Sequence, residues 1–189
     1  MIREFLRQHP RIVKFKFNQE VETFTKQIAT KNIKLELEKT GKYVFIVEQG
    51  DTPSYFLPWC KNTGYYIDLP LNISTTNPKL FITAELSGCF VGVQKIDDVI
   101  RVRHYNLKDN ENLNMDDFRT YDTEQSRTHW LIPDRGNNVA SFEANGIPCE
   151  HYSEYSYVRS AFMWGEYEKN QWKFFYQTPQ GEVRPFAFE

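Results

Sequence analysis

The stretch that decides the fold is Leu86-Ser87-Gly88-Cys89-Phe90-Val91-Gly92-Val93, with its return Val99-Ile100-Arg101-Val102-Arg103-His104. Both runs are rich in valine, isoleucine and other residues that favour strands. Asp97-Asp98 lies between them and fits a two-residue turn. The sequence therefore predicts a β-hairpin with a cysteine at the entrance of its first strand and a histidine near the end of its second.

The register of this hairpin places the cysteine beside the histidine. If Asp97-Asp98 is the loop, Val91 faces His104 on the opposite strand. Side chains alternate along a strand, so Cys89 shares the face of Val91 and is a diagonal neighbour of His104, with Cα atoms about 7–8 Å apart. A slip of one residue would place the two on opposite faces. We expect this face to point into the core, because it also carries Val91, Val93, Ile100 and Val102.

A cysteine beside a histidine has a chemical use. A thiol with its ordinary pKa of about 8.5 is only a few per cent thiolate at neutral pH, and a neighbouring imidazolium lowers that pKa. Gly88 permits a sharp bend, and backbone N–H groups around Ser87 and Gly88 are candidate oxyanion donors that would bind the substrate. The pattern indicates an acyl-transfer site built on Cys89 and His104. The alternative is structural, because free cysteines in valine-rich strands are commonly core residues.

Leu86-Ser87-Gly88-Cys89, followed by a strand and then His104, resembles the Leu-x-Gly-Cys motif and downstream histidine of bacterial glutamine-deamidase toxins. These are the catalytic domain of the cytotoxic necrotizing factors and the Burkholderia lethal factor. The resemblance extends from Thr83 to His104 and is faint elsewhere. It implies that Cys89 is the nucleophile and His104 its partner, and that Thr83 matches a threonine that completes the site of the lethal factor.

The resemblance implies a protein glutamine deamidase that uses no metal or cofactor. The Cys89 thiolate would attack the side-chain amide of a glutamine on a host protein, and His104 would protonate the departing ammonia. A Rho-family GTPase or a translation-initiation helicase is the candidate target. The resemblance further implies a secreted or injected protein that acts in the host cytosol.

The composition suits one domain that spans residues 1–189. Hydrophobic residues make up 40% and aromatic residues 16%, enough for a core without cofactor or disulfide. The net charge of −2 and pI of about 6.1 argue against a nucleic-acid or anionic-membrane binder. No apolar run approaches the roughly 18 residues of a membrane span, and no signal-peptide pattern is visible. We expect a monomer that enters its host by a dedicated route.

The three cysteines, Cys60, Cys89 and Cys149, are too sparse for a disulfide framework, and we expect free thiols. Together with the scattered histidines they form no zinc-binding pattern. Cys149 and His151 make a second Cys–His pair, but nothing around them resembles an activating site.

The rest of the chain is mostly predicted as strands. A helix is predicted over 19–30, after the N-cap Asn18, and a short one near 114–118. Loops are predicted over 51–64, 71–79 and 106–124. Strands are predicted within 1–18 and at 33–38, 43–47, 65–69, 80–86, 126–132, 139–144, 157–167, 171–178 and 183–188.

These elements indicate an α+β domain whose core is a β-sandwich of mixed or antiparallel sheets flanked by a few helices. The resemblance implies the same architecture. Two other functions remain open. One is a non-catalytic β-sandwich that binds a protein through aromatic loops, and the other is a Cys–His peptidase or amidase.

Overall fold

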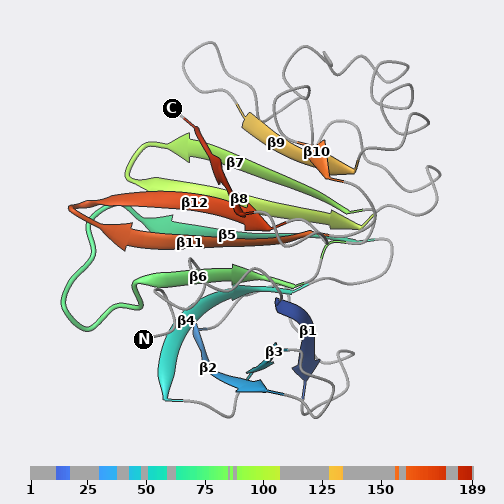
Figure 1. Ribbon diagram of the computed structural model, residues 1–189. Helices are drawn as coiled ribbons and strands as arrows, with labels where there is room; N and C mark the ends of the chain where they lie inside the picture. The colour runs from blue at the N-terminus through green and yellow to red at the C-terminus, as the bar shows by residue number, and fades with distance from the viewer. Residues whose placement is uncertain are drawn as a thin grey trace.

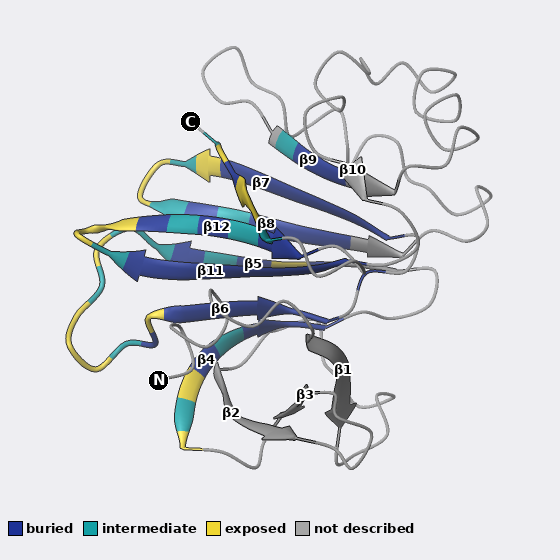
Figure 2. Ribbon diagram, in the orientation of Figure 1, coloured by how far each residue is buried: buried dark blue, intermediate teal, exposed yellow. Residues whose placement is uncertain are grey.

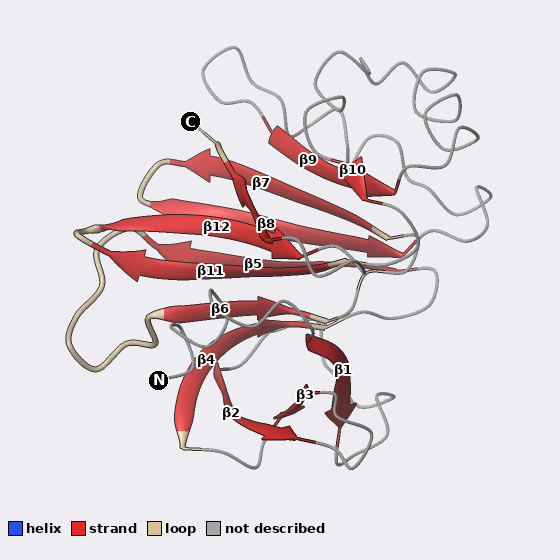
Figure 3. Cartoon of the chain, viewed as in Figure 1, coloured by secondary structure: helices blue, strands red, loops and turns tan. Residues whose placement is uncertain are grey.

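Strands dominate the part of the chain that can be described (Figure 3). The computed structural model describes residues 12–17, 30–37, 43–47, 51–58, 63–84, 86, 89–106, 128–133, 156–157, 161–177 and 183–188. Within these ranges the chain forms strands, turns and loops but no helix. Among them, no helix has the length and apolar character needed to cross a membrane.

The described strands form two sheets, one of eight strands and one of five (Figure 1). The larger sheet has the order β1-β3-β2-β4-β6-β11-β12-β13 and is mixed, since β1 is parallel to β3 and β4 to β6. Its strands are β1 (Ile12–Phe17), β2 (Thr30–Leu37), β3 (Tyr43–Val47), β4 (Thr52–Leu57), β6 (Leu80–Thr83), β11 (Phe162–Glu168), β12 (Gln171–Gln177) and β13 (Val183–Phe186).

The smaller sheet has the order β10-β9-β7-β8-β5 and carries the central hairpin. Its pairs are antiparallel except β10 with β9. Its strands are β5 (Thr63–Pro70), β7 (Phe90–Ile96), β8 (Val99–Asn106), β9 (Thr128–Pro133) and β10 (Ser156–Tyr157).

One hydrophobic core joins the two sheets, and β6, β7 and β11 are buried along most of their length (Figure 2). The larger sheet contributes Leu57, Phe81, Met163, Tyr167, Trp172, Phe174, Tyr176 and Phe186. The smaller sheet contributes Tyr65, Ile67, Leu69, Val91, Val93, Ile100, Val102 and Leu131. The predicted core of two packed sheets, with mixed pairing, is therefore confirmed for the described residues. The predicted helices lie outside them except for Thr30, which begins β2, so the α+β class remains a prediction.

The central hairpin has the predicted register. Ile96 pairs with Val99, and Val91 pairs with His104. The turn at Asp97-Asp98 places Asp97 at a φ of 46°, in the left-handed region that tight hairpin turns require and that aspartate tolerates better than most residues. On the far side β8 pairs with β5, where Arg101 binds the carboxylate of Asp68 through two hydrogen bonds of 2.6 and 2.7 Å. The strand that carries His104 is thus held on both sides.

The predicted loop over 51–64 is wrong for its first half. Thr52–Leu57 forms β4, between β2 and β6 in the larger sheet. Pro53 masked this strand, because proline is rare inside sheets. It is accommodated because β6 pairs with β4 only from Tyr55 onward, so the missing N–H lies outside that ladder. Phe56 is buried in this strand.

The single strand predicted over 157–167 is also wrong. Ser156–Tyr157 belongs to the smaller sheet, whereas Phe162–Glu168 belongs to the larger one. The change of sheet is invisible in the pattern, since both pieces carry strand-favouring aromatic residues. The strand predicted over 139–144 lies outside the described residues.

A glycine at the centre of the larger sheet allows two aromatic rings to meet. Gly165 on β11 pairs with Phe81 of β6 on one side and Phe174 of β12 on the other. The two rings pack edge to face with centroids 5.9 Å apart. A Cβ atom on residue 165 would lie 2.9 Å from Cε1 of Phe174. Because glycine has no side chain, the Phe174 ring fits into the space that a Cβ atom on residue 165 would occupy.

We expect Gly165→Ala to lower the free energy of unfolding by about 1–3 kcal/mol, because overpacking outweighs the gain from replacing a flexible glycine. Urea denaturation measures the change. The double variant with Phe174→Leu serves as a control and should lose less on addition of the alanine than the parent does. An alanine that stabilises the parent would contradict this account.

Candidate functional site

The Leu86–Cys89 motif carries the chain from one sheet to the other. Leu86 exchanges two backbone hydrogen bonds, of 2.8 and 2.9 Å, with Ala161, which directly precedes β11 of the larger sheet. Cys89 directly precedes β7 of the smaller sheet. Both side chains are buried in the shared core. The predicted oxyanion donors Ser87 and Gly88 lie outside the described residues, so their role remains a prediction.

His104 lies in the middle of the smaller sheet and faces the core. It pairs with Val91 on β7 and with Tyr65 on β5. The core residues Val91 and Val102 share its face of the sheet. Across the core, the backbone of Leu57 and Pro58, at the end of β4, interacts with the imidazole. His104 thus touches both layers of the molecule.

Cys89 directly precedes β7, and the register of β7 with β8 is the predicted one. Because Phe90 pairs with Tyr105, continuing this register by one residue puts Cys89 diagonal to His104, which is the predicted placement. Both are almost closed to solvent, with exposures of 3% for Cys89 and 1% for His104. Cys89 forms no disulfide with any described residue. The pair is therefore a thiol and an imidazole held inside an apolar core.

Burial determines the charge of the histidine. It lowers the pKa of His104 from 6.5 to about 4, although the backbone of Pro58 and Leu57 partly opposes this by favouring the protonated ring. Neither ring nitrogen makes a hydrogen bond of normal geometry within the described part of the chain. The ring is thus neutral at neutral pH, with one nitrogen that carries a proton and one that can accept a proton.

The chemistry of the pair differs from the expectation in one respect. The sequence suggested an imidazolium that holds a thiolate, whereas the structure places a neutral imidazole beside the cysteine. A neutral imidazole accepts a proton, so His104 is suited to act as a general base that removes the thiol proton during attack. Charge separation then accompanies the reaction and is absent from the resting site.

The backbone of Pro58 is a functional group that sequence reasoning missed. Proline has no N–H, so the backbone group it presents to the imidazole is its carbonyl oxygen. The carbonyl of Leu57 already accepts the N–H of Ala84 at 2.9 Å. The Pro58 carbonyl is therefore the candidate acceptor for a ring N–H of His104, and it would stabilise the ring in its protonated form. No residue-type pattern announces such a group, because every residue has a carbonyl.

Thr83 is buried, but its hydroxyl binds the backbone of β11. It accepts the N–H of Met163 and donates to the carbonyl of the same residue, both at 3.2 Å. Thr83 also pairs with Leu57, whose backbone reaches His104. Thr83 is therefore the pairing partner of a residue whose backbone interacts with His104. Its hydrogen bonds fix the position of β6 against β11.

The described residues hold no group of three or more histidine, cysteine, aspartate or glutamate side chains arranged to bind a metal ion. Cys60, Cys149 and His151 lie outside them.

Comparison with known proteins adds no family. None of the protein-family models matches the chain, and no curated protein matches it. The deamidase resemblance thus depends on the motif and on the geometry described above.

The hydroxyl of Thr83 gives a test of its structural role. Thr83→Val should lower the free energy of unfolding by about 1–3 kcal/mol, because the buried Met163 backbone loses both partners. Thr83→Ser is the matched control and should keep most of this stability, since serine retains the hydroxyl. Urea denaturation compares the three proteins, and a valine variant as stable as the parent would refute the assignment.

The depressed pKa of His104 makes stability depend on pH. Its folded pKa of about 4 lies below the unfolded value of 6.5, so between these values the unfolded chain binds a proton that the folded chain does not. The contribution is complete above pH 6.5 and falls as the pH drops towards 4, by about 3 kcal/mol in total.

His104→Leu removes the titration of this imidazole, whereas the carboxylates that also titrate in acid remain. Urea denaturation at pH 7 and pH 4.5 should show a smaller loss of stability for His104→Leu than for the parent. Equal losses in the two proteins would mean that His104 titrates normally in the folded state.

Proposed function

We propose that the chain is a cysteine-dependent protein glutamine deamidase of the bacterial toxin or effector type. The observation that carries the proposal is the register of the β7–β8 hairpin, which has Val91 opposite the buried His104 and the buried Cys89 directly before β7. The available ring nitrogens of His104 support it, because a buried histidine without hydrogen bonds is costly as a purely structural residue. The resemblance of the Leu86–Cys89 motif to that of the glutamine deamidases is the reason for proposing a side-chain amide as the group attacked.

In the first half of the reaction, His104 removes the proton from the Cys89 thiol as Sγ attacks the carbon of a glutamine side-chain amide. A C–S bond forms, and the carbonyl electrons move to oxygen. As the tetrahedral intermediate collapses, the C–N bond breaks and His104 returns the proton to the leaving nitrogen. Ammonia departs, and the glutamyl group remains on Cys89 as a thioester.

In the second half, His104 removes a proton from water, and the resulting hydroxide adds to the thioester carbon. The C–S bond then breaks, and the proton returns to Cys89. Glutamine and water have become glutamate and ammonia, without any redox change. The Pro58 carbonyl would orient His104 and stabilise its transient positive charge.

The target class follows from the resemblance alone. A Rho-family GTPase or a translation-initiation helicase of a host cell is the proposed substrate, and action in the host cytosol after secretion or injection is the proposed location. The chemical effect would be a negative charge in place of a neutral amide, which suffices to disable an active site. The helices that flank the sheets in the α+β domain are likewise part of the proposal.

One observation favours a second candidate, a non-catalytic β-sandwich binding module. Cys89 is 3% exposed, as expected of a core cysteine. A deamidase must expose Sγ to its substrate at least transiently, whereas a binding module need not. The accessibility and acidity of the thiol therefore separate the two functions.

Alkylation of the three cysteines by iodoacetamide between pH 5 and 9, read by peptide mass spectrometry, measures both properties. If the proposal is correct, Cys89 in the folded parent reacts faster near neutral pH than it does in His104→Gln, by about tenfold or more. His129→Gln is the matched control. It removes a histidine from β9 of the same sheet, at a position that pairs with Val93 rather than Val91.

The same proteins are then incubated with purified Rho-family GTPases and a translation-initiation helicase. Deamidation raises the mass of an uncut target by about one unit, and Cys89→Ser should abolish it. Cleaved peptide bonds would favour a peptidase instead. A Cys89 that resists alkylation throughout, with intact targets unchanged in mass, would favour the binding module.

A further inference from the structure

The strand β5 forms one edge of the smaller sheet. It pairs with β8 along its whole length, from Thr63 with Asn106 to Pro70 with Val99. Among the described strands, none pairs with its other edge. The edge of a strand presents a row of backbone N–H and C=O groups to which a further strand can bind.

The hydrogen-bond pattern of the sheet identifies the backbone groups on this open edge. In an antiparallel pair, only every second residue of a strand exchanges hydrogen bonds with a given neighbour. The N–H of Leu71 donates to the carbonyl of Asp98 at 3.0 Å, which extends the β5–β8 ladder by one residue. Odd-numbered residues of β5 therefore bond to β8. The N–H and C=O groups of Gly64, Tyr66 and Asp68 consequently point to the open edge.

One end of this edge is closed by the chain itself. Pro70 has no N–H, and its carbonyl accepts the indole N–H of Trp172 at 2.9 Å. The open part of the edge is therefore the stretch from residue 64 to residue 68. It contains no lysine or proline, and its register with β8 runs without a bulge. It thus lacks the devices with which proteins commonly keep an edge strand from pairing.

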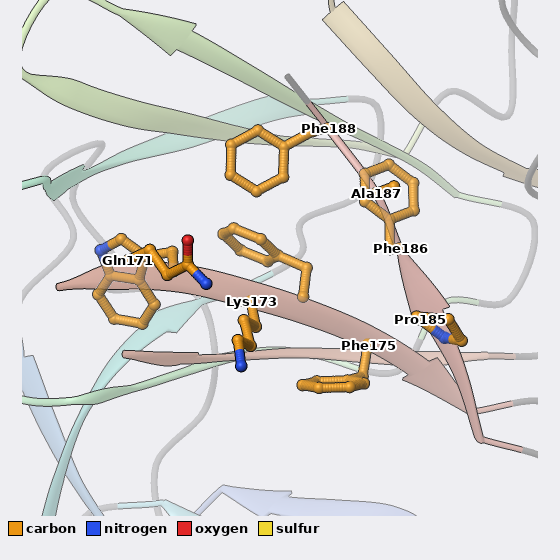
Figure 4. Close-up of a pocket in the computed structure, with 9 residues that line it drawn as sticks. Gln171, Lys173, Phe175, Pro185, Phe186, Ala187 and Phe188 are labelled. Atoms are coloured by element: carbon orange, nitrogen blue, oxygen red, sulfur yellow. The ribbon is translucent and has the colours of Figure 1, made fainter. Parts of the chain in front are cut away.

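The aromatic cavity beside β12 is a different case (Figure 4). It has a volume of about 240 Å³ and lies between β12 and the residues that follow β13. Continuing the register of β12 with β13 puts Ala187 opposite Lys173 and Phe188 opposite Trp172. The chain therefore occupies that strand edge with its own residues, whereas β5 offers its edge to another molecule.

We propose that β5 is a self-association edge, where two copies of the chain pair antiparallel about a two-fold axis at Tyr66. Tyr66 would face Tyr66 of the second copy, and Gly64 of each copy would face Asp68 of the other. Each facing pair would exchange two backbone hydrogen bonds. The two smaller sheets would then form one continuous sheet. The inference goes beyond the proposed deamidase function and does not depend on it.

The side chains on the outer face of β5 suit this register. Tyr66 is 52% exposed, and the guanidinium carbon of Arg101 lies 4.4 Å from the centre of its ring. The two tyrosines would form an aromatic cross-strand pair, with each ring already held by an arginine. Gly64 has no side chain and leaves room for Asp68 of the second copy. The edge is therefore complementary to itself in shape.

The charges on this edge favour the same register. Asp68 is the only charged residue of β5, and it forms an ion pair with Arg101 at 2.6 Å. No net charge therefore opposes the approach of a second copy. A register that placed the two Asp68 side chains opposite each other would bring like charges together, which is unfavourable. Centring the axis on Tyr66 keeps them apart.

The length of the open edge sets the expected affinity. A standard protein interface buries about 1,600 Å² in total, and a pair of strands this short buries less. We expect a dissociation constant of about 10–100 µM. The chain would thus be a monomer at low concentration and a dimer above this range.

Sedimentation velocity between about 1 µM and 1 mM measures the association of the full chain. Amide hydrogen exchange followed by NMR at the two ends of this range tests the mode of pairing. Exchange of the Tyr66 and Asp68 amides should slow by about tenfold or more at the higher concentration. The amides of Tyr65 and Ile67 are the internal control and should be unchanged, because they already bond to β8.

A charge-swap experiment tests the two-fold axis. Tyr66→Lys and Tyr66→Glu should each weaken self-association by about tenfold or more, because like charges would face each other across the axis. An equimolar mixture of the two variants should associate at least about tenfold more tightly than either variant alone. Thr75→Lys, at an exposed position in the loop between β5 and β6, is the matched charge control and should associate like the parent. Circular dichroism confirms that each variant is folded.

Several results would overturn the proposal. One is a parent chain that stays monomeric up to about 1 mM. Others are a dimer that Tyr66→Lys leaves unchanged, a mixture of charge variants that associates no better than its components, and amide protection located away from β5. Cys89→Ser should dimerise like the parent, so failure of the deamidase proposal and failure of this one are distinguishable.

Discussion

The pairing register of β7 and β8 is the constraint on which both the core and the candidate site depend. With Val91 opposite His104, the apolar residues of both strands face the larger sheet, and Cys89 directly precedes the strand that pairs with β8. A shift of one residue would turn this apolar set towards the outer face and separate the two reactive groups. The register needed for packing is therefore also the register that the proposed chemistry requires.

The environment that this register creates determines what the pair can do. His104 lies among core residues at 1% exposure, and burial disfavours its charged form. Its proton affinity is then too low to hold a thiolate at rest but sufficient to accept a proton during attack, when the new negative charge lies close by. Leu57 of β4 pairs with Thr83 of β6, and the hydroxyl of Thr83 binds the backbone of β11. The position of the Pro58 carbonyl, which follows Leu57, therefore depends on the pairing of β4 with β6.

The sequence predicts this hairpin because the relevant signals are local. Two strand-favouring runs and a two-residue turn determine the register, and alternation then assigns Cys89 to the inner face. The pattern fails where tertiary context decides. Pro53 hides β4, whose place between β2 and β6 depends on distant strands. The bonds of Thr83 to Met163 and the approach of the Pro58 backbone to His104 join residues far apart in the chain. The neutral state of His104 likewise follows from its burial, which cannot be deduced from the residue type.

The physical cost of His104 bears on its role. A sandwich built for stability alone would place an apolar residue at this position, because a buried imidazole without normal hydrogen bonds gives up its hydration, at about 1–3 kcal/mol. The neighbouring inward positions on β8 follow that rule, since Ile100 and Val102 are apolar. His104 departs from it on the strand that pairs with β7, which Cys89 directly precedes. Local departures from good packing are typical of functional sites. The coincidence of this departure with the only cysteine among the described residues favours chemistry over packing as the reason for the histidine.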